Sequence, residues 1–139
     1  MKELNFDTGL VTYDLNGKCE VSFNPTDTVF AKKMFDVFNA LDQKEKEYKE
    51  QAEKIKDTAE IFDFFKKTEN EMRNMIDGIF DVPVCDSVFE NVSVYALSDG
   101  LPLWVNLMLA IMDEMNVSVM NEQKRMNPRV AEYMKKYKK

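Results

Sequence analysis

The stretch MFDVFNALDQKEKEYKEQAEKIKDTAEIF, residues 34–62, decides the fold of this chain. Its apolar side chains recur in steps of four and three residues, which places them in a seam along one side of a helix. The members of this seam are Met34, Phe38, Leu41, Glu45, Tyr48, Ala52, Ile55, Ala59 and Phe62. Only Glu45 among them is charged, so the seam requires a partner helix, and the pattern indicates packing and assembly rather than catalysis.

The residues before the seam mark the start of a helix. Asn24 is able to cap a helix, Pro25 suits the first helical position, and Asp27 falls in the first turn near the positive end of the helix dipole. The wide apolar face that follows narrows after Asp42 to the seam alone. We therefore expect one long amphipathic helix over about residues 25–65, with its base packed in the domain and a coiled-coil-like contact farther along.

A second helix is expected where the apolar period breaks. Thr68-Glu69-Asn70-Glu71 matches a capping box, which predicts a helix over about residues 68–80. Gly78 and Asp81-Val82-Pro83 then end it. The alternative is one continuous helix over residues 26–80 with Thr68 exposed, and the sequence leaves both open.

The first part of the chain, about residues 4–24, predicts a β-hairpin with a turn at Asn16-Gly17. A two-residue loop there would mix apolar and polar side chains on both faces. We prefer a three-residue loop over 15–17, because it makes one face apolar, and that face must then cover another element. The resulting pairs are Asp14 with Lys18, Tyr13 with Cys19, and Val11 with Val21.

The rest of the chain is predicted to add an irregular segment, a central helix and a basic tail. Residues 81–98 carry too many apolar side chains for a free linker, so we expect them to lie across the core. Ser98 or Asp99 is expected to cap a helix over about 99–126, which is apolar almost all round and therefore central. Residues 127–139 form a short terminal helix or tail.

Together these elements predict a single domain over residues 1–139. Its class is mostly α with an N-terminal β-hairpin (α+β), with one long amphipathic helix plus two or three shorter helices. A hydrophobic content of 45% is typical of a globular chain and disfavours wholesale disorder.

The composition argues against an enzyme. The chain has no His, which removes the usual acid–base group at neutral pH, the usual metal ligand and any His-dependent nucleophile. Cys19 and Cys85 are the only cysteines, and two cysteines form neither a zinc site nor a disulfide framework at this length. We expect no catalytic residues, no cofactor and no metal, and both thiols are interpreted as small buried residues in a reducing cytoplasm.

A cytoplasmic location is expected. The opening MKELNFDTG lacks the apolar run of a signal peptide. The apolar stretch Leu101–Met112 is interrupted by Pro102 and Asn106 and is too short to span a bilayer. No membrane contact is therefore predicted.

Charge is divided unevenly along the chain. Residues 121–139 carry seven basic and two acidic residues, a balance of +5 within a net charge of −6, which leaves −11 on residues 1–120. An acidic body with a basic tail could self-associate head to tail or bind an acidic partner, although a solvated, fraying terminus is the simpler interpretation. The basic tail ends in Lys135, Lys136, Lys138 and Lys139.

An aromatic cluster, Ile61-Phe62-Asp63-Phe64-Phe65, ends the predicted long helix. We interpret it first as core packing against Trp104, with docking of a partner as the alternative. The residues proposed to bind a partner through the seam and this cluster are Leu41, Tyr48, Ile55, Phe62 and Phe65.

Two stretches carry a family resemblance. Residues 4–49, LNFDTGLVTYDLNGKCEVSFNPTDTVFAKKMFDVFNALDQKEKEYK, are similar to the start of an uncharacterised small protein family of Firmicutes phages and prophages. Residues 80–115, FDVPVCDSVFENVSVYALSDGLPLWVNLMLAIMDEM, resemble the later part of the same family. The resemblance is one of overall pattern and supplies no catalytic motif.

The resemblance implies a gene of a phage tail module, where small proteins act as tail assembly chaperones that hold the tape-measure protein before the tail tube polymerises. We therefore expect a non-enzymatic structural or tail-assembly protein that acts through helix-mediated contacts. Its expected partners are a second copy of itself and a phage tail or tape-measure protein. The resemblance also implies the cytoplasm of a bacterial host cell as its location, and it leaves open whether the protein stays in a finished virion. The alternative is a regulatory adaptor whose basic tail binds nucleic acid or an acidic partner, but the acidic body makes nucleic acid the less favoured ligand.

Overall fold

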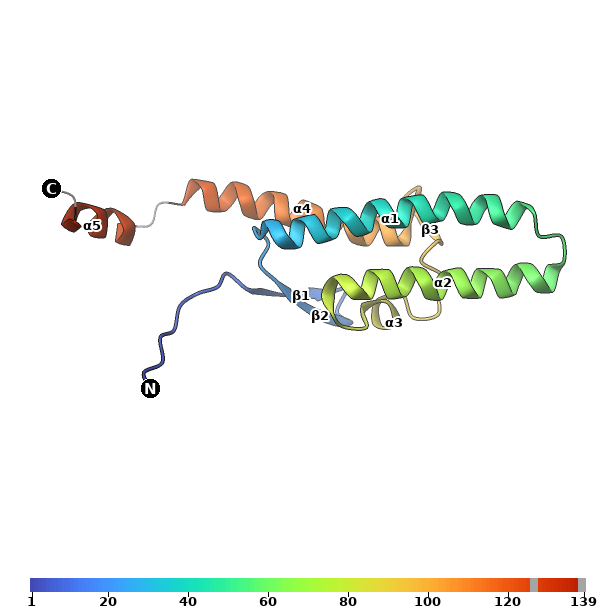
Figure 1. The fold of residues 1–139 in the computed structure, drawn as a ribbon, viewed down its shortest axis with the longest axis horizontal. Helices are drawn as coiled ribbons and strands as arrows, with labels where there is room; N and C mark the ends of the chain where they lie inside the picture. Colours follow the sequence, from blue (N-terminus) through green and yellow to red (C-terminus); the bar gives the residue numbers. More distant parts are fainter. Residues whose placement is uncertain (126–127, 138–139) are drawn as a thin grey trace.

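The computed structural model describes residues 1–125 and 128–137, and its longest elements are two helices that run antiparallel side by side (Figure 1). The first, α1, spans Thr28–Glu53, and the second, α2, spans Thr58–Phe80. A short turn over residues 54–57 joins them. The fold class, mostly α with an N-terminal hairpin, is confirmed.

The predicted long helix over 25–65 is wrong, and so is the continuous alternative over 26–80. The chain leaves helical geometry after Lys54, whose backbone N–H bonds to the carbonyls of Gln51 and Ala52, and Asp57 starts the next helix with φ −83° and ψ 128°. The seam therefore folds back on its own chain. Helix α1 runs along α2, where Tyr48 of the seam meets Phe64, and Phe38 of the seam packs against Trp104 of a later helix, α4 (Leu103–Lys124). Helices of the same polypeptide therefore provide the partner that the pattern requires.

Two predicted helix starts are also wrong. The N-cap of α1 is Asp27, whose side chain accepts a hydrogen bond from the backbone of Val29 at 2.9 Å, while Asn24 caps the turn before the helix. Thr68 is buried inside α2 instead of beginning it. Its hydroxyl donates to the carbonyl of Phe65 at 3.0 Å, so the capping-box match was fortuitous.

The N-terminal hairpin forms as predicted, with a different register. Strand β1 spans Val11–Leu15 and β2 spans Cys19–Phe23. The three loop residues are 16–18, where Asn16 and Gly17 have positive φ. Shifting the pairing by two residues leaves the same face apolar, which is why pattern alone did not fix the register. The observed pairs are Val11 with Phe23, Thr12 with Ser22, Tyr13 with Val21, Asp14 with Glu20, and Leu15 with Cys19.

The segment predicted as irregular contains short regular elements. Helix α3 spans Val84–Val88, and strand β3, Leu97–Ser98, pairs with β4, Leu101–Pro102. Asp99 and Gly100 form the turn between these strands, with φ of 56° and 76°. The expectation that Ser98 or Asp99 caps the next helix is therefore wrong, because both residues belong to a tight hairpin.

Helix α4 spans Leu103–Lys124, and α5 spans Pro128–Tyr137. The first half of α4 is central, as predicted, and Trp104 packs against Phe38 with ring centroids 5.3 Å apart. By length and composition alone α4 is the one helix in the described part of the chain that could cross a membrane. Four of its residues lie in the protein core, namely Trp104, Leu107, Met108 and Ile111.

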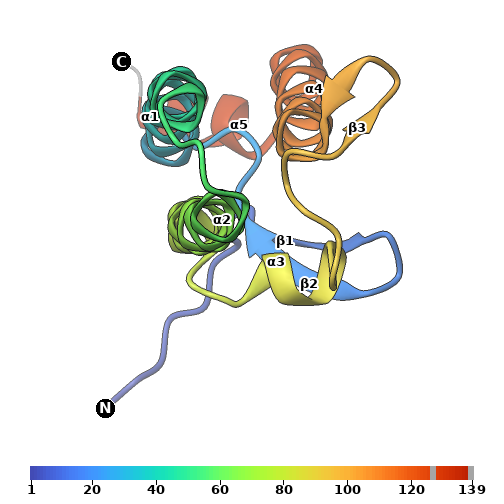
Figure 2. The same cartoon turned by 90° about the vertical axis from the view of Figure 1, so that its right-hand side faces the viewer.

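One core holds these elements together. Viewed end-on, α1 and α4 lie on one side, and α2, α3 and the β-hairpin lie on the other (Figure 2). Between them lie buried side chains from β2 and from all four of these helices. The most deeply buried large residues are Trp104, Met34, Leu41, Met72, Ile76 and Met108.

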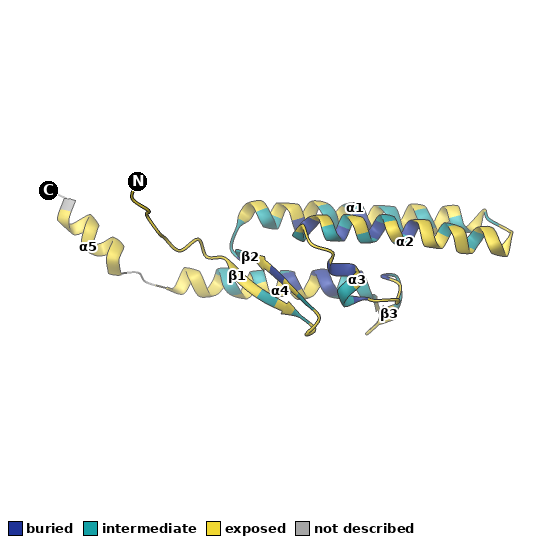
Figure 3. Ribbon diagram, turned by 90° about the horizontal axis from the view of Figure 1, so that it is seen from below, coloured by how far each residue is buried: buried dark blue, intermediate teal, exposed yellow. Residues whose placement is uncertain are grey.

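Three parts of the molecule project from this core. These are the free end of the α1–α2 hairpin, the end of α4 with α5 beyond it, and the N-terminal residues 1–10 (Figure 3). Most of their residues are exposed. The candidate interaction surfaces lie on these projections because the core itself is already covered.

Candidate interaction surfaces

The five residues predicted to bind a partner through the seam do not form one surface. Leu41 has 0% exposed surface and lies in the core, so it cannot contact another molecule in this structure. Tyr48 is half-buried against α2, and Ile55 lies half-buried in the turn that joins the two helices. Phe62 and Phe65 alone are exposed, at 64% and 49%.

Tyr48 on α1 holds the free end of the α1–α2 hairpin together through contacts with α2. Its ring meets that of Phe64 edge-on, with centroids 6.0 Å apart, and its hydroxyl donates a short hydrogen bond to the carboxylate of Glu71. Burial, followed by this hydrogen bond and the charge of Glu71, raises the pKa of Tyr48 above its ordinary value. Tyr48 therefore stays protonated as a donor within the hairpin and is not available as a docking group.

Phe62 and Phe65 form an exposed aromatic pair near the start of α2. Their ring centroids lie 6.4 Å apart with the planes at 74°, and Phe64 lies next to Phe65 at 6.3 Å. The preferred expectation, burial of this cluster against Trp104, is wrong, since Trp104 packs against Phe38 instead. The pair lies on the outer side of a helix whose inner side is satisfied by α1, so a second surface must cover it if it is to be buried.

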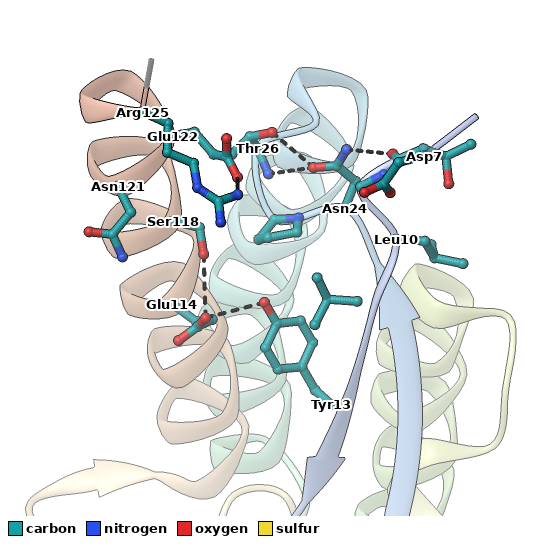
Figure 4. A pocket seen from close by; sticks show the side chains of 14 residues that line it. Asp7, Leu10, Tyr13, Asn24, Thr26, Glu114, Ser118, Asn121, Glu122 and Arg125 are labelled. Carbon is teal, nitrogen blue, oxygen red and sulfur yellow. Dashed lines mark hydrogen bonds and ion pairs between the residues drawn. The ribbon is translucent and has the colours of Figure 1, made fainter. Parts of the chain in front are cut away.

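A cleft of about 1030 Å³ opens between the N-terminal arm and the second half of α4 (Figure 4). Tyr13 reaches across it from β1 and donates to the carboxylate of Glu114 on α4 at 3.2 Å. Ser118, one turn farther along α4, lies 3.3 Å from the same carboxylate. The remaining lining residues are Asp7, Thr8, Gly9, Leu10, Val11, Asn24, Pro25, Thr26, Asn121, Glu122 and Arg125.

Asn24 sets the course of the arm along this cleft. Its amide nitrogen donates to the carbonyl of Thr8 at 2.9 Å, and its amide oxygen accepts from the backbone of Thr26 at 2.8 Å. Gly9 has φ +73°, and a Cβ there would lie 2.5 Å from the Asn24 amide nitrogen. Only glycine fits this close approach, so Gly9 and Asn24 together determine where the arm leaves the body.

The cleft combines hydrogen-bonding side chains with apolar ones. Burial, the Glu114 charge and the hydrogen bond to Glu114 raise the pKa of Tyr13, which keeps its proton at neutral pH. Among the described residues, no group of three His, Cys, Asp or Glu side chains is placed to hold a metal ion. The cleft thus offers carboxylates, amides and apolar groups, which are the components of a recognition surface.

Cys85 lies apart from these surfaces. It is fully buried, its backbone N–H donates to the Asp77 carboxylate at 2.9 Å, and burial raises the pKa of its thiol. Cys19 is half-buried, and both cysteines are free. A buried thiol with a raised pKa is a poor nucleophile, so Cys85 acts as a packing residue.

Arg73 on α2 is a polar side chain with several partners that the sequence did not single out. It bonds to Glu69 and Asp86 at 2.9 Å each, and to the carbonyls of Glu90 and Val92 at 2.9 Å. Glu69 in turn accepts from the backbone of Val94. This network holds the segment after α3 against α2, which is a structural role and not part of a binding surface.

The basic tail is placed only in part. Lys135 and Lys136 are exposed on α5, whereas Lys138 and Lys139 lie outside the described residues. Helix α5 projects beyond the end of α4, away from the rest of the molecule (Figure 1). The aromatic pair and the basic helix therefore lie at opposite ends of the long axis.

Comparison of the chain with protein-family models, with curated proteins and with solved structures found no match.

Proposed function

We propose that this chain is a non-enzymatic structural or tail-assembly protein of a phage or prophage, which binds a partner protein through its helices. The observation that carries the proposal is the exposed pair Phe62 and Phe65 on the projecting helical hairpin. Two large aromatic side chains on a helix that is already packed on its other side are typical of a docking position. The resemblance of residues 4–49 and 80–115 to a phage family supports the same class of function.

The partner that fits this position is an amphipathic helix, such as a segment of a tape-measure protein. An apolar stripe with residues at positions i, i+3 and i+4 would cover both rings in a helix-to-helix contact. Lys66 and Lys67 follow the pair directly along α2, so acidic residues beside the partner's apolar stripe would be favoured. The hairpin would then hold the partner helix while its own fold stays unchanged.

Pull-down from an induced or infected lysate tests this proposal. The wild-type chain should recover a tape-measure or tail protein, and a Phe62→Ser, Phe65→Ser double variant should recover at least about tenfold less, because each lost aromatic anchor removes on the order of 1–2 kcal/mol. The measurement is mass-spectrometric quantification of the tape-measure or tail protein in the eluate.

A Val29→Ser, Phe35→Ser variant is the matched control, because these residues are exposed to 76% and 60% at the other end of the hairpin. The control should retain wild-type recovery. Failure of the wild-type chain to recover either phage protein, or equal recovery by all three proteins, would contradict the proposal.

A further inference from the structure

Helix α5 is a basic amphipathic helix whose apolar side is uncovered. Val130, Tyr133 and Met134 share one side of it at spacings of three and four residues, and they are 62%, 55% and 61% exposed. Arg129, Lys135 and Lys136 lie on the other side. A ten-residue helix is marginal in water by itself, so a surface that covered this apolar stripe would stabilise it.

The cleft between the N-terminal arm and α4 has the complementary character. Its lining carries three carboxylates, from Asp7, Glu114 and Glu122, against the single guanidinium of Arg125. Arg125 pairs with Glu122 at 3.2 Å, so the lining keeps a net charge of −2. Apolar surface lies among these charges, from Leu10, Val11 and Pro25. Leu10 is 63% exposed and Val11 40% exposed, so this apolar surface is open to an incoming helix.

We propose that α5 of one copy docks in this cleft of a second copy. Its apolar stripe would cover the apolar side chains of the arm and β1, while its lysines would face Glu114 and Glu122 of α4. The charge division along the chain, +5 on residues 121–139 and −11 on the remainder, acts in the same direction over a longer range. The contact joins two different surfaces, so it is heterologous and builds an open chain of copies unless a ring closes.

The geometry at the end of α4 favours a second copy over the protein's own cleft. Arg125, the C-cap of α4, has φ −74° and ψ 134°, an extended conformation that carries the chain onward instead of turning it back over the cleft. In the structure α5 lies beyond the end of α4, away from the body (Figure 1). The negative charge on residues 1–120 also disfavours anionic ligands such as nucleic acid. The proposal does not depend on a phage partner and goes beyond the proposed function.

A charge-swap experiment on the pure full-length protein tests the contact. One variant carries Glu114→Lys and Glu122→Lys in the cleft, and the other carries Lys135→Glu and Lys136→Glu on α5. The readout is solution mass by light scattering over a range of concentrations at low salt. Wild-type mass should rise above the 16.3 kDa of one chain as concentration increases, and high salt should reverse the rise.

Each variant alone should remain at 16.3 kDa. Its cleft and its α5 carry charges of the same sign, so α5 of one copy is repelled by the cleft of the next. An equimolar mixture should regain self-association, since the basic helix of one variant meets the acidic cleft of the other and the reverse contact is also restored. A mixture that stays monomeric, or a wild-type chain that is monomeric throughout, would overturn the proposal.

A third variant controls for loss of the Tyr13–Glu114 contact in the cleft variant. Val130→Asp with Met134→Asp changes only exposed positions of α5, so the fold should be kept and self-association lost. Glu132→Gln, on the polar side of α5, is the control and should still assemble. Assembly that survives Val130→Asp with Met134→Asp would overturn the proposal. A salt-sensitive gel shift with nucleic acid by a chain that stays at 16.3 kDa would overturn it in favour of the adaptor function.

Discussion

Replacement of Leu41 by Asp should lower the free energy of unfolding by more than about 4 kcal/mol, enough to unfold a domain of ordinary stability. Leu41 has 0% exposed surface in the middle of the seam, between α1 and the rest of the core. The change removes a buried apolar side chain and puts a carboxylate without a partner in its place, so the cost of a cavity and the cost of desolvation act together. Urea denaturation followed by circular dichroism measures the loss.

The matched control is Ile55→Asp, a change at another position of the same seam. Ile55 lies half-buried in the turn at the free end of the hairpin, and its charged replacement can reach water. We expect it to cost less than about 1.5 kcal/mol. Equal effects at the two positions would contradict the observed burial of the seam, because a long continuous helix would present both residues to its partner in the same way.

Replacement of Arg73 by Ala should cost about 2–4 kcal/mol of stability. The Arg73 side chain is only 13% exposed and Glu69 only 18%. The loss therefore leaves the nearly buried Glu69 carboxylate with neutral donors only, from Ser93 and Val94, and removes the side-chain donor of two backbone carbonyls. Asp86 is 79% exposed and returns to water at little cost, which keeps the total below that of a fully buried ion pair. Thermal unfolding should show a single transition at a lower temperature.

Two further variants separate charge from geometry at this position. Arg73→Lys keeps the charge but lacks the planar fork that reaches four partners, so we expect an intermediate loss. Lys32→Ala removes an ion pair with Asp36 that is 76% and 58% exposed, and it should change stability by less than about 1 kcal/mol. If Arg73→Ala were as mild as Lys32→Ala, the network would not be holding the segment after α3 in place.

The positions of the apolar residues predicted which segments are strands and which are helices. Apolar residues alternate with polar ones in the hairpin and recur every three or four residues in the helices. In the N-terminal hairpin, the odd-numbered residues of both strands are apolar, and this parity fixes which face packs inward. It does not fix the register, because a shift of two residues preserves the parity. The loop over residues 16–18 depends on the left-handed conformations of Asn16 and Gly17 together, and the preferred loop over 15–17 used only the second of them.

The residues at which the helices begin and end were predicted least well from the sequence. The seam keeps its heptad spacing through residues 54–57, where no Gly or Pro marks a turn, so the period continues across a reversal of the chain. Asp57 followed by Thr58, with Glu60 in the first turn, was a helix start that could have been found. Asp99-Gly100 is likewise typical of a tight β-hairpin turn, but it was interpreted as a helix cap.

The structure bears on the exposure of the candidate partner-binding residues, and their binding stays a prediction. The sequence identified Phe62, Phe65 and the basic tail as candidates, but not the burial of Leu41, which depends on where the chain reverses. The Arg73 network and the cleft were not predictable from spacing. Glu69 and Arg73 lie four residues apart on α2, but the other bonded pairs of the network are 13 to 25 residues apart. Tyr13 and Glu114 are 101 residues apart. Only the tertiary fold brings these residues together.

The central claim is that the seam from Met34 to Ala52 is covered by α2 and α4 of the same chain, and the concentration dependence of thermal unfolding tests it most directly. The measurement uses the Val130→Asp, Met134→Asp variant, so that contacts through α5 do not contribute, over a hundredfold range of protein concentration. An intramolecular partner predicts one melting temperature at every concentration. A melting temperature that rises steadily with concentration would show that a second chain covers the seam and would contradict this account.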